Sequence, residues 1–155
     1  MAKFFSTDVA RAHHRLVFAL VNAELKRNER ITAPIIIMCY GGISALEIGA
    51  RGEDGVSADV DFHFIHGTPP AVKTAFFEAV RAVYTANSHN LEHDFMNTAI
   101  TAFMNADHQR EISQAGVYSL LWKPTDPTRS RLWMYHGPFG VSLAGKMDKM
   151  TNEIL

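Results

Sequence analysis

The chain has 155 residues, which is the size of one ordinary domain with a single hydrophobic core. Its 15 Lys and Arg residues nearly balance its 16 Asp and Glu residues, and the net charge of -1 excludes a generally basic nucleic-acid binder and an acidic disordered tail. Hydrophobic residues make up 47% of the chain, which is typical of a folded protein. The single cysteine, Cys39, excludes an intrachain disulfide and favours a reducing compartment.

Neither the start of the chain nor its apolar runs predict a targeting or membrane-spanning segment. The first lysine is followed by only two apolar residues before polar ones begin, which is unlike a signal peptide. The longest continuous apolar run, residues 35–40, is far too short to cross a bilayer. We therefore expect a cytoplasmic or nuclear protein that has no membrane partner.

The first part of the chain predicts a helix followed by a buried strand. Apolar residues recur at steps of three and four from Val9 to Ala23, which predicts an amphipathic helix that ends near Asn28. The segment 32–34 contains a proline and breaks this pattern. The continuous apolar run 35–40 then predicts a strand that is covered on both faces.

A glycine pair and an alternating strand come next. Gly41 and Gly42 end the first strand, residues 44–48 predict a short helix, and residues 51–57 are polar and glycine-rich, which predicts a loop. Residues 58–65 alternate between polar and apolar side chains, which predicts a second strand with two different faces. One face carries Asp59, Asp61 and His63, and the other carries Val60, Phe62 and Phe64.

The second half of the chain predicts helices and a strand pair. A helix is expected to begin at the proline pair Pro69-Pro70 and to break at 87–90, and helical spacing restarts over 91–103. Strands are predicted over 116–123 and 131–135, joined by turn-forming residues as a hairpin, with a last amphipathic helix over 141–154. The order of these elements predicts one α+β domain.

The glycine pair and the alternating strand could together form a site for a phosphorylated ligand. Glycines let a ligand approach the backbone closely, and a helix that starts just after them offers free N–H groups to an anion, with the hydroxyl of Ser44 as a further donor. Asp59 and Asp61 share a face, and paired carboxylates can hold one or two Mg²⁺ ions. A phosphate-binding loop opposite a carboxylate metal site is what phosphoryl or nucleotidyl transfer needs.

His63 continues the row of Asp59 and Asp61. On that face it could be a metal ligand or a general base, or it could be a structural histidine beyond the site. An imidazole in the row would favour Zn²⁺ or Mn²⁺ over Mg²⁺. Cys39, inside the apolar run, is predicted to be a buried structural thiol.

The apolar strand, the Gly-Gly-x-Ser segment, the short helix and the Asp-x-Asp strand together resemble the nucleotidyltransferase (DNA polymerase β-like) superfamily. Within it, the chain is most similar to the small AbiEii-type group. Residues 94–99 are similar to that group's Asp-Trp-Leu-Asn-Asp segment. Residues 135–147 are similar to its strand followed by Leu-Leu-Ala-x-Lys-Leu.

This resemblance implies one nucleotidyltransferase-like domain over residues 1–155, with a small mixed β-sheet flanked by helices. It implies transfer of a nucleotidyl group from a nucleoside triphosphate with Mg²⁺, or Mn²⁺, to an acceptor that can be RNA or a protein. On this reading Gly41, Gly42 and Ser44 would hold the triphosphate, and Asp59 and Asp61 would bind the metal. Lys146 would contact phosphate or dock a helix.

The chain also departs from the family pattern. The family usually has an arginine four residues before the first aspartate, where this chain has Gly55, and a third carboxylate on a later strand, where residues 116–123 and 131–135 have no acid. One alternative is therefore a catalytically degenerate nucleotide- or partner-binding module, for which a homo-oligomer remains open. Another is a transition-metal site formed by Asp59, Asp61 and His63 on the same scaffold.

Overall fold

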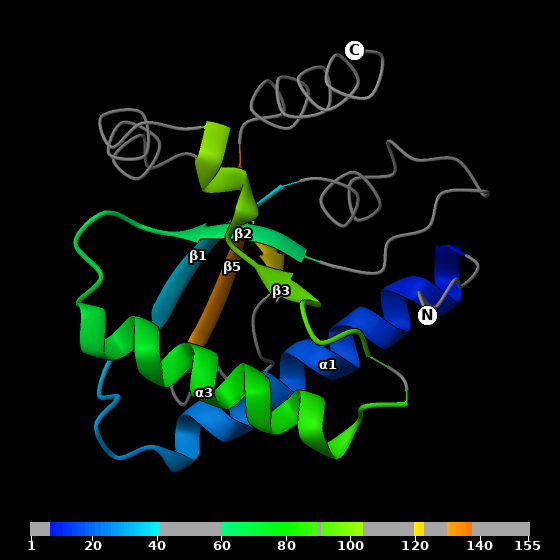
Figure 1. The fold of residues 1–155 in the computed structure, drawn as a ribbon, viewed down its shortest axis with the longest axis horizontal. Coiled ribbons are helices and arrows are strands. Elements are labelled where there is room, and N and C mark those ends of the chain that lie inside the picture. The colour runs from blue at the N-terminus through cyan, green and yellow to red at the C-terminus, as the bar shows by residue number, and fades with distance from the viewer. Residues whose placement is uncertain (1–6, 41–59, 90, 104–119, 123–129, 138–155) are drawn as a thin grey trace.

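The protein is described by a computed structural model, which covers residues 7–40, 60–89, 91–103, 120–122 and 130–137 (Figure 1). Several predictions fall outside these residues, namely the helices over 44–48 and 141–154 and the loop over 51–57. Five candidate site residues also lie outside the described residues: Gly41, Gly42, Ser44, Asp59 and Lys146.

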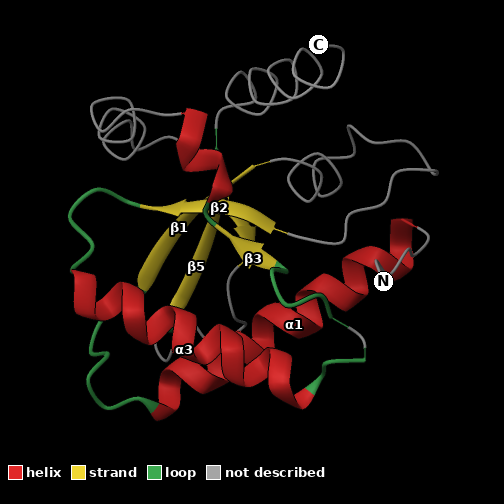
Figure 2. Ribbon diagram, viewed as in Figure 1, coloured by secondary structure: helices red, strands yellow, loops and turns green. Residues whose placement is uncertain are grey.

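The described residues form a mixed five-stranded sheet with two long helices on one of its faces (Figure 2). This arrangement confirms the predicted α+β class with a small mixed sheet and helices beside it. The strand order across the sheet is β3-β2-β1-β5-β4. The elements in chain order are α1 (Thr7–Arg27), β1 (Ile35–Tyr40), β2 (Val60–Phe64), α3 (Pro70–Ala86), β3 (Met96–Asn97), the 3₁₀ helix η1 (Ala99–Phe103), β4 (Leu120–Trp122) and β5 (Leu132–His136).

Strand β1 lies at the centre of the sheet, as its apolar sequence predicts. It pairs antiparallel with β2 on one side and parallel with β5 on the other. Five of its six residues are buried, which confirms that it is covered on both faces. At the sheet edges, β3 runs parallel to β2, and β4 runs antiparallel to β5, as predicted for the last two strands.

The larger core lies between the sheet and the two long helices. Alternate residues of each strand point to this side, because successive side chains of a strand point to opposite faces. The buried side chains of this core include Val21 and Leu25 of α1, Phe76 and Val80 of α3, and Phe62 of β2. A smaller cluster on the other face consists of Met38, Tyr40 and Ile100, with Ile65 and Tyr135 packed against it.

The helix predicted over 91–103 is wrong, because this segment contains only the short strand β3 and the 3₁₀ helix η1. The Asn97 side chain accepts a hydrogen bond from the Ala99 N–H (3.1 Å) and donates one to the Asp94 carbonyl (3.2 Å). Asparagine side chains that bond locally to the backbone in this way compete with α-helix formation. The apolar spacing reflects burial instead, since Leu91 and Phe95 belong to the larger core.

Candidate functional site

The two faces of β2 differ as the alternating sequence predicts. Val60, Phe62 and Phe64 are buried in the larger core beneath the helices. Asp61 and His63 therefore point to the opposite face, on which η1 lies in yellow-green above the sheet in Figure 1. The described part of the Asp-x-Asp-x-His row thus lies on the face that the long helices leave uncovered.

Asp61 lies between two neighbouring strands. Across the sheet it pairs with Tyr40, the last residue of β1, and on its other side with Asn97 of β3. Asp61 is half-buried, so part of its surface is accessible to solvent. Burial raises the pKa of the Cys39 thiol, and the negative charge of Asp61 raises it further. The predicted buried thiol of Cys39 is confirmed.

The register of β1 and β2 pairs the residue that precedes the glycine pair with the second aspartate of the Asp-x-Asp motif. Tyr40 directly precedes Gly41 and Gly42 in the chain, and Asp61 directly follows the Asp59-Val60 pair. Since Tyr40 and Asp61 are cross-strand partners, the chain leaves β1 toward the glycine pair beside the point where β2 begins. The glycines and Asp59 themselves lie outside the described residues.

His63 is almost completely buried, with 1% of its surface exposed. Its Nε2 lies 2.8 Å from the Tyr40 hydroxyl, and its Nδ1 lies 2.9 Å from the Phe64 carbonyl oxygen. A carbonyl oxygen can only accept, so Nδ1 carries the proton and donates it. In the neutral ring, Nε2 then accepts a hydrogen bond from the Tyr40 hydroxyl. Both ring nitrogens are engaged within the protein, as expected of a buried polar group.

Asp61 and His63 differ in how well they suit a divalent metal ion. The half-buried Asp61 carboxylate suits a hard cation such as Mg²⁺ as one ligand. His63 does not fit as a ligand in this arrangement, because its nitrogen lone pair is directed at Tyr40. Across the part of the chain that the structure describes, no group of three or more His, Cys, Asp and Glu side chains could hold a metal ion. The metal role predicted for Asp59 lies outside that part.

The strand beside β2 carries an amide next to Asp61. Asn97 is the partner of Asp61 on β3, and its side chain makes the two local backbone hydrogen bonds described above. Strand β3 is not apparent from the sequence, because the apolar residues of 91–103 recur at helical spacing. Tyr40 was also missed, although a hydroxyl ending an apolar strand just before two glycines was a usable signal.

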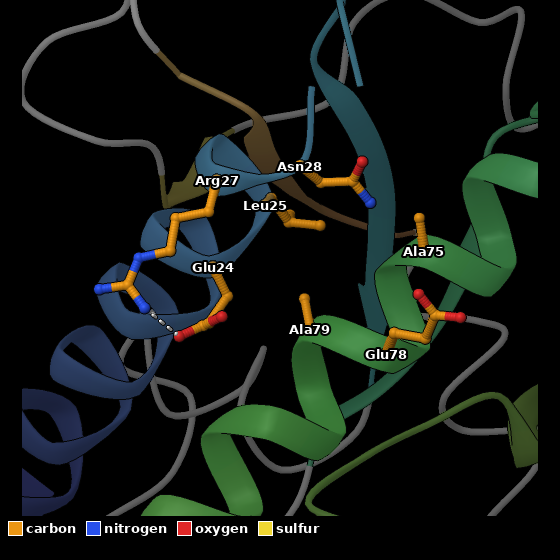
Figure 3. Close-up of a pocket in the computed structure, with 7 residues that line it drawn as sticks. All are labelled: Glu24, Leu25, Arg27, Asn28, Ala75, Glu78 and Ala79. Carbon is orange, nitrogen blue, oxygen red and sulfur yellow. Dashed lines mark hydrogen bonds and ion pairs between the residues drawn. The ribbon is translucent and has the colours of Figure 1, made fainter. Parts of the chain in front are cut away.

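Two cavities lined by described residues lie away from Asp61 and His63. One, of about 240 Å³, lies between α1 and α3, where Glu24 is paired with Arg27 at 3.0 Å and Glu78 lies on the facing helix (Figure 3). The other, of about 380 Å³, lies where the loop before β1 meets the loop before α3, and Arg30 and His66 are among its lining residues. Neither cavity is lined by Asp61 or His63, the two predicted site residues that the structure describes.

Among the helices that the structure describes, none is both long and apolar enough to cross a membrane. Comparison of the chain with family models, with curated proteins and with solved structures yields no match.

Proposed function

We propose that the chain binds a nucleoside triphosphate together with Mg²⁺ and transfers its nucleotidyl group to an acceptor, on a nucleotidyltransferase-like fold. The observation that supports this most directly is the pairing of Tyr40 with Asp61. This register brings the chain that leads into Gly41 and Gly42 next to a half-buried carboxylate, on the face of the sheet opposite the long helices.

The chemistry of this end of the sheet suits a metal-bound triphosphate. Glycines after a strand permit close approach of phosphate oxygens to backbone N–H groups, and a carboxylate beside them can hold the cation that accompanies the phosphates. Gly41, Gly42 and Ser44 would orient the triphosphate, with Lys146 as a further phosphate contact.

Asp61, together with Asp59, would hold the metal ion. A bound Mg²⁺ would supply charge stabilisation for the leaving pyrophosphate and for the attacking oxygen of the acceptor. Mn²⁺ would serve in its place, since it prefers the same oxygen ligands. The acceptor, RNA or a protein, would approach from the same face of the sheet.

A second candidate function is nucleotide binding without transfer, as a catalytically degenerate module. It is favoured by the departures from the family pattern, since Gly55 stands where the family has an arginine and residues 116–123 and 131–135 carry no third carboxylate. The two candidates differ in one observable, since only the first forms a covalent product from a radiolabelled triphosphate.

The replacement of Asp61 by Asn tests the proposed site. We expect Asp61→Asn to weaken Mg²⁺-dependent binding of a fluorescent ATP, GTP, CTP or UTP analogue at least tenfold, because it removes an anionic ligand with almost no change in volume. Asp94→Asn is the matched control, since Asp94 is an exposed carboxylate close to β3, and it should bind as the wild type does.

Unchanged affinity in the Asp61→Asn variant, or absence of binding by the wild type to all four analogues, would contradict the proposal. Where binding is present, incubation with triphosphates labelled at the α-phosphate decides between the two candidates. Incorporation of label into an acceptor supports transfer, whereas binding without incorporation supports the degenerate module.

A further inference from the structure

We infer that the cavity between the loop before β1 and the loop before α3 is a binding site for a small organic carboxylate with an apolar body. This cavity has a volume of about 380 Å³, and all the residues that line it belong to the described part of the chain. The inference goes beyond the proposed function and does not depend on it, because the cavity lies away from Asp61.

The cavity and Asp61 lie at opposite ends of the central strands. Ile35 and Ile36, which begin β1, line the cavity together with Ile65, which follows β2 directly. The Ile65 N–H donates to the Ile36 carbonyl at 3.2 Å, so the two strand ends are joined beside the cavity. Asp61 pairs instead with Tyr40, the last residue of β1. Because Tyr40 is about 16 Å along the strand from Ile35, a small ligand in the cavity would not contact Asp61.

The more buried part of the cavity lining is apolar. Ile31 and Ile35 are buried, while Ile36, Ile65 and Val72 are half-buried. Pockets that bind small molecules have volumes of about 300–1,000 Å³ and are mostly apolar, with a few polar groups that orient the ligand. The volume and the isoleucine-rich lining therefore suit the apolar body of a small molecule such as phenylacetate or hexanoate.

The exposed part of the lining carries a positive charge and no negative charge. Arg30 is an exposed lining residue, and its guanidinium is always protonated. None of the described residues that line the cavity is Asp or Glu. Pro69 and Val72, at the start of α3, also line it, and the first turn of this helix has no acidic residue to offset its partial positive charge. A negatively charged group is therefore favoured near Arg30.

Hydrogen bonds within the two loops hold the cavity in shape. In the loop before β1, the Arg30 N–H donates to the Asn28 side chain at 3.0 Å, and the Ile31 N–H donates to the Asn28 carbonyl at 3.0 Å. In the loop before α3, the Thr68 hydroxyl donates to the Ile65 carbonyl at 2.8 Å. A ligand that enters a cavity already formed in this way has little loop ordering to offset.

The apolar lining and the single arginine together define the ligand class. A guanidinium can bind a carboxylate through two parallel hydrogen bonds, while the isoleucines contact the apolar body. A nucleoside triphosphate is a poor match, because it carries several negative charges and a polar sugar. A neutral apolar molecule would gain nothing from the charge of Arg30. A small free carboxylate meets both requirements.

The test is an NMR titration of the full chain, labelled with ¹³C at the isoleucine δ-methyl groups, at one fixed pH. We expect phenylacetate and hexanoate to cause saturable shifts of the Ile36 and Ile65 methyl signals. The Ile100 methyl group, which is buried in the smaller cluster, serves as an internal reference that should not shift. Phenylacetamide and hexanamide have nearly the same shape but no charge, and they should bind at least tenfold more weakly.

Arg30→Gln removes the charge at an exposed position, so the fold should be unaffected. We expect this variant to bind phenylacetate at least fivefold more weakly and phenylacetamide as the wild type does. Arg27→Gln is the matched control, because Arg27 is also exposed but lines the other cavity, and it should bind phenylacetate as the wild type does.

Val72→Phe tests the cavity itself by filling part of its volume. We expect it to weaken the binding of phenylacetate and of phenylacetamide alike, by at least fivefold. Ala71→Phe is the matched control, since Ala71 is an exposed neighbour in the same helix and does not line the cavity.

Several outcomes would overturn this inference. One is the absence of saturable Ile36 and Ile65 shifts with both acids, and another is equal affinity for an acid and its amide. Equal affinity of wild type and Arg30→Gln for phenylacetate would also overturn it. Tighter binding of dodecanoate would assign the cavity to a long lipid chain, and tighter binding of ATP at the same methyl groups would assign it to a nucleotide. None of these results bears on the Asp61→Asn test, so this inference and the proposed function can fail separately.

Discussion

Cys39 lies at the centre of the sheet, fully buried among the apolar side chains of the larger core. Burial raises the pKa of its thiol strongly, because a thiolate would lose its hydration there, and the charge of Asp61 raises it further. The folded protein therefore holds the thiol proton more tightly than the unfolded chain does. The resulting contribution to stability is fully present below the unfolded thiol pKa of about 8.5 and is lost as the pH rises above it.

This shift predicts a pH dependence that the Cys39→Ala variant should lack. Above about pH 8.5, the free energy of unfolding of the wild type should fall relative to that of the variant by up to about 1.4 kcal/mol per pH unit. Urea unfolding of both proteins between pH 7 and pH 10 measures this difference, and titration of other groups cancels in the comparison. A difference that stays constant over this range would show that the thiol ionises equally easily in both states.

At the scale of elements, α1 is tied to the start of β5 by polar groups as well as by apolar packing. The buried Asn22 side chain accepts a hydrogen bond from the Arg131 N–H at 2.8 Å. The Arg131 side chain in turn donates to the carbonyl of Ile31, just beyond the end of α1, at 3.2 Å. These two bonds join segments about a hundred residues apart, so they set how the helix lies against the sheet.

We expect Asn22→Ala to lower the free energy of unfolding by about 1–3 kcal/mol, because the Arg131 N–H loses its acceptor in a partly buried place. Asn28→Ala is the matched control, since the Asn28 side chain accepts from the exposed Arg30 N–H, and it should cost no more than about 0.5 kcal/mol. Urea unfolding measures both values. Equal losses in the two variants would mean that the hydrogen bond between Asn22 and Arg131 does not contribute specifically to the docking of α1.

At the scale of the whole molecule, an aromatic cluster joins α3 to β2. The Phe76 ring is fully buried, and its centroid lies 5.3 Å from that of Phe62 and 5.2 Å from that of Phe64. The neighbouring Phe77 also contacts these rings but is 39% exposed. Adjacent phenylalanines of one helix thus differ in burial, because successive helical residues point about 100° apart.

This difference predicts unequal effects of the same substitution. Phe76→Ala should cost about 3–5 kcal/mol through lost burial and the cavity left behind, which is a large share of the stability of a small domain. Phe77→Ala should cost about 1 kcal/mol, because its site is partly open to water. Chemical denaturation of the two variants checks the order, and a larger loss for Phe77 would contradict the described packing of α3.

Local pattern alone determined much of the secondary structure. The strand predicted over 35–40 matches β1 residue for residue, and the alternation over 58–65 correctly assigned the two faces of β2. The proline pair correctly marked the start of α3. These features follow from the periods of two and 3.6 residues, which are properties of a single segment. The helical spacing over 91–103 gave a wrong prediction of a helix. There the Asn97 side chain accepts a hydrogen bond from the Ala99 N–H, and β3 pairs with β2.

Tertiary structure decided what each site residue contacts. The pairing of Tyr40 with Asp61 and the hydrogen bond from Tyr40 to His63 join positions more than twenty residues apart. The sequence alone therefore left His63 open as a ligand, a base or a structural residue. Strand register and burial depend on how several segments pack together, so they cannot be predicted from the sequence of one segment. The sequence by itself determined β1, the start of α3 and the polar face of β2, and only the packed sheet showed that the imidazole on that face is already bound to Tyr40.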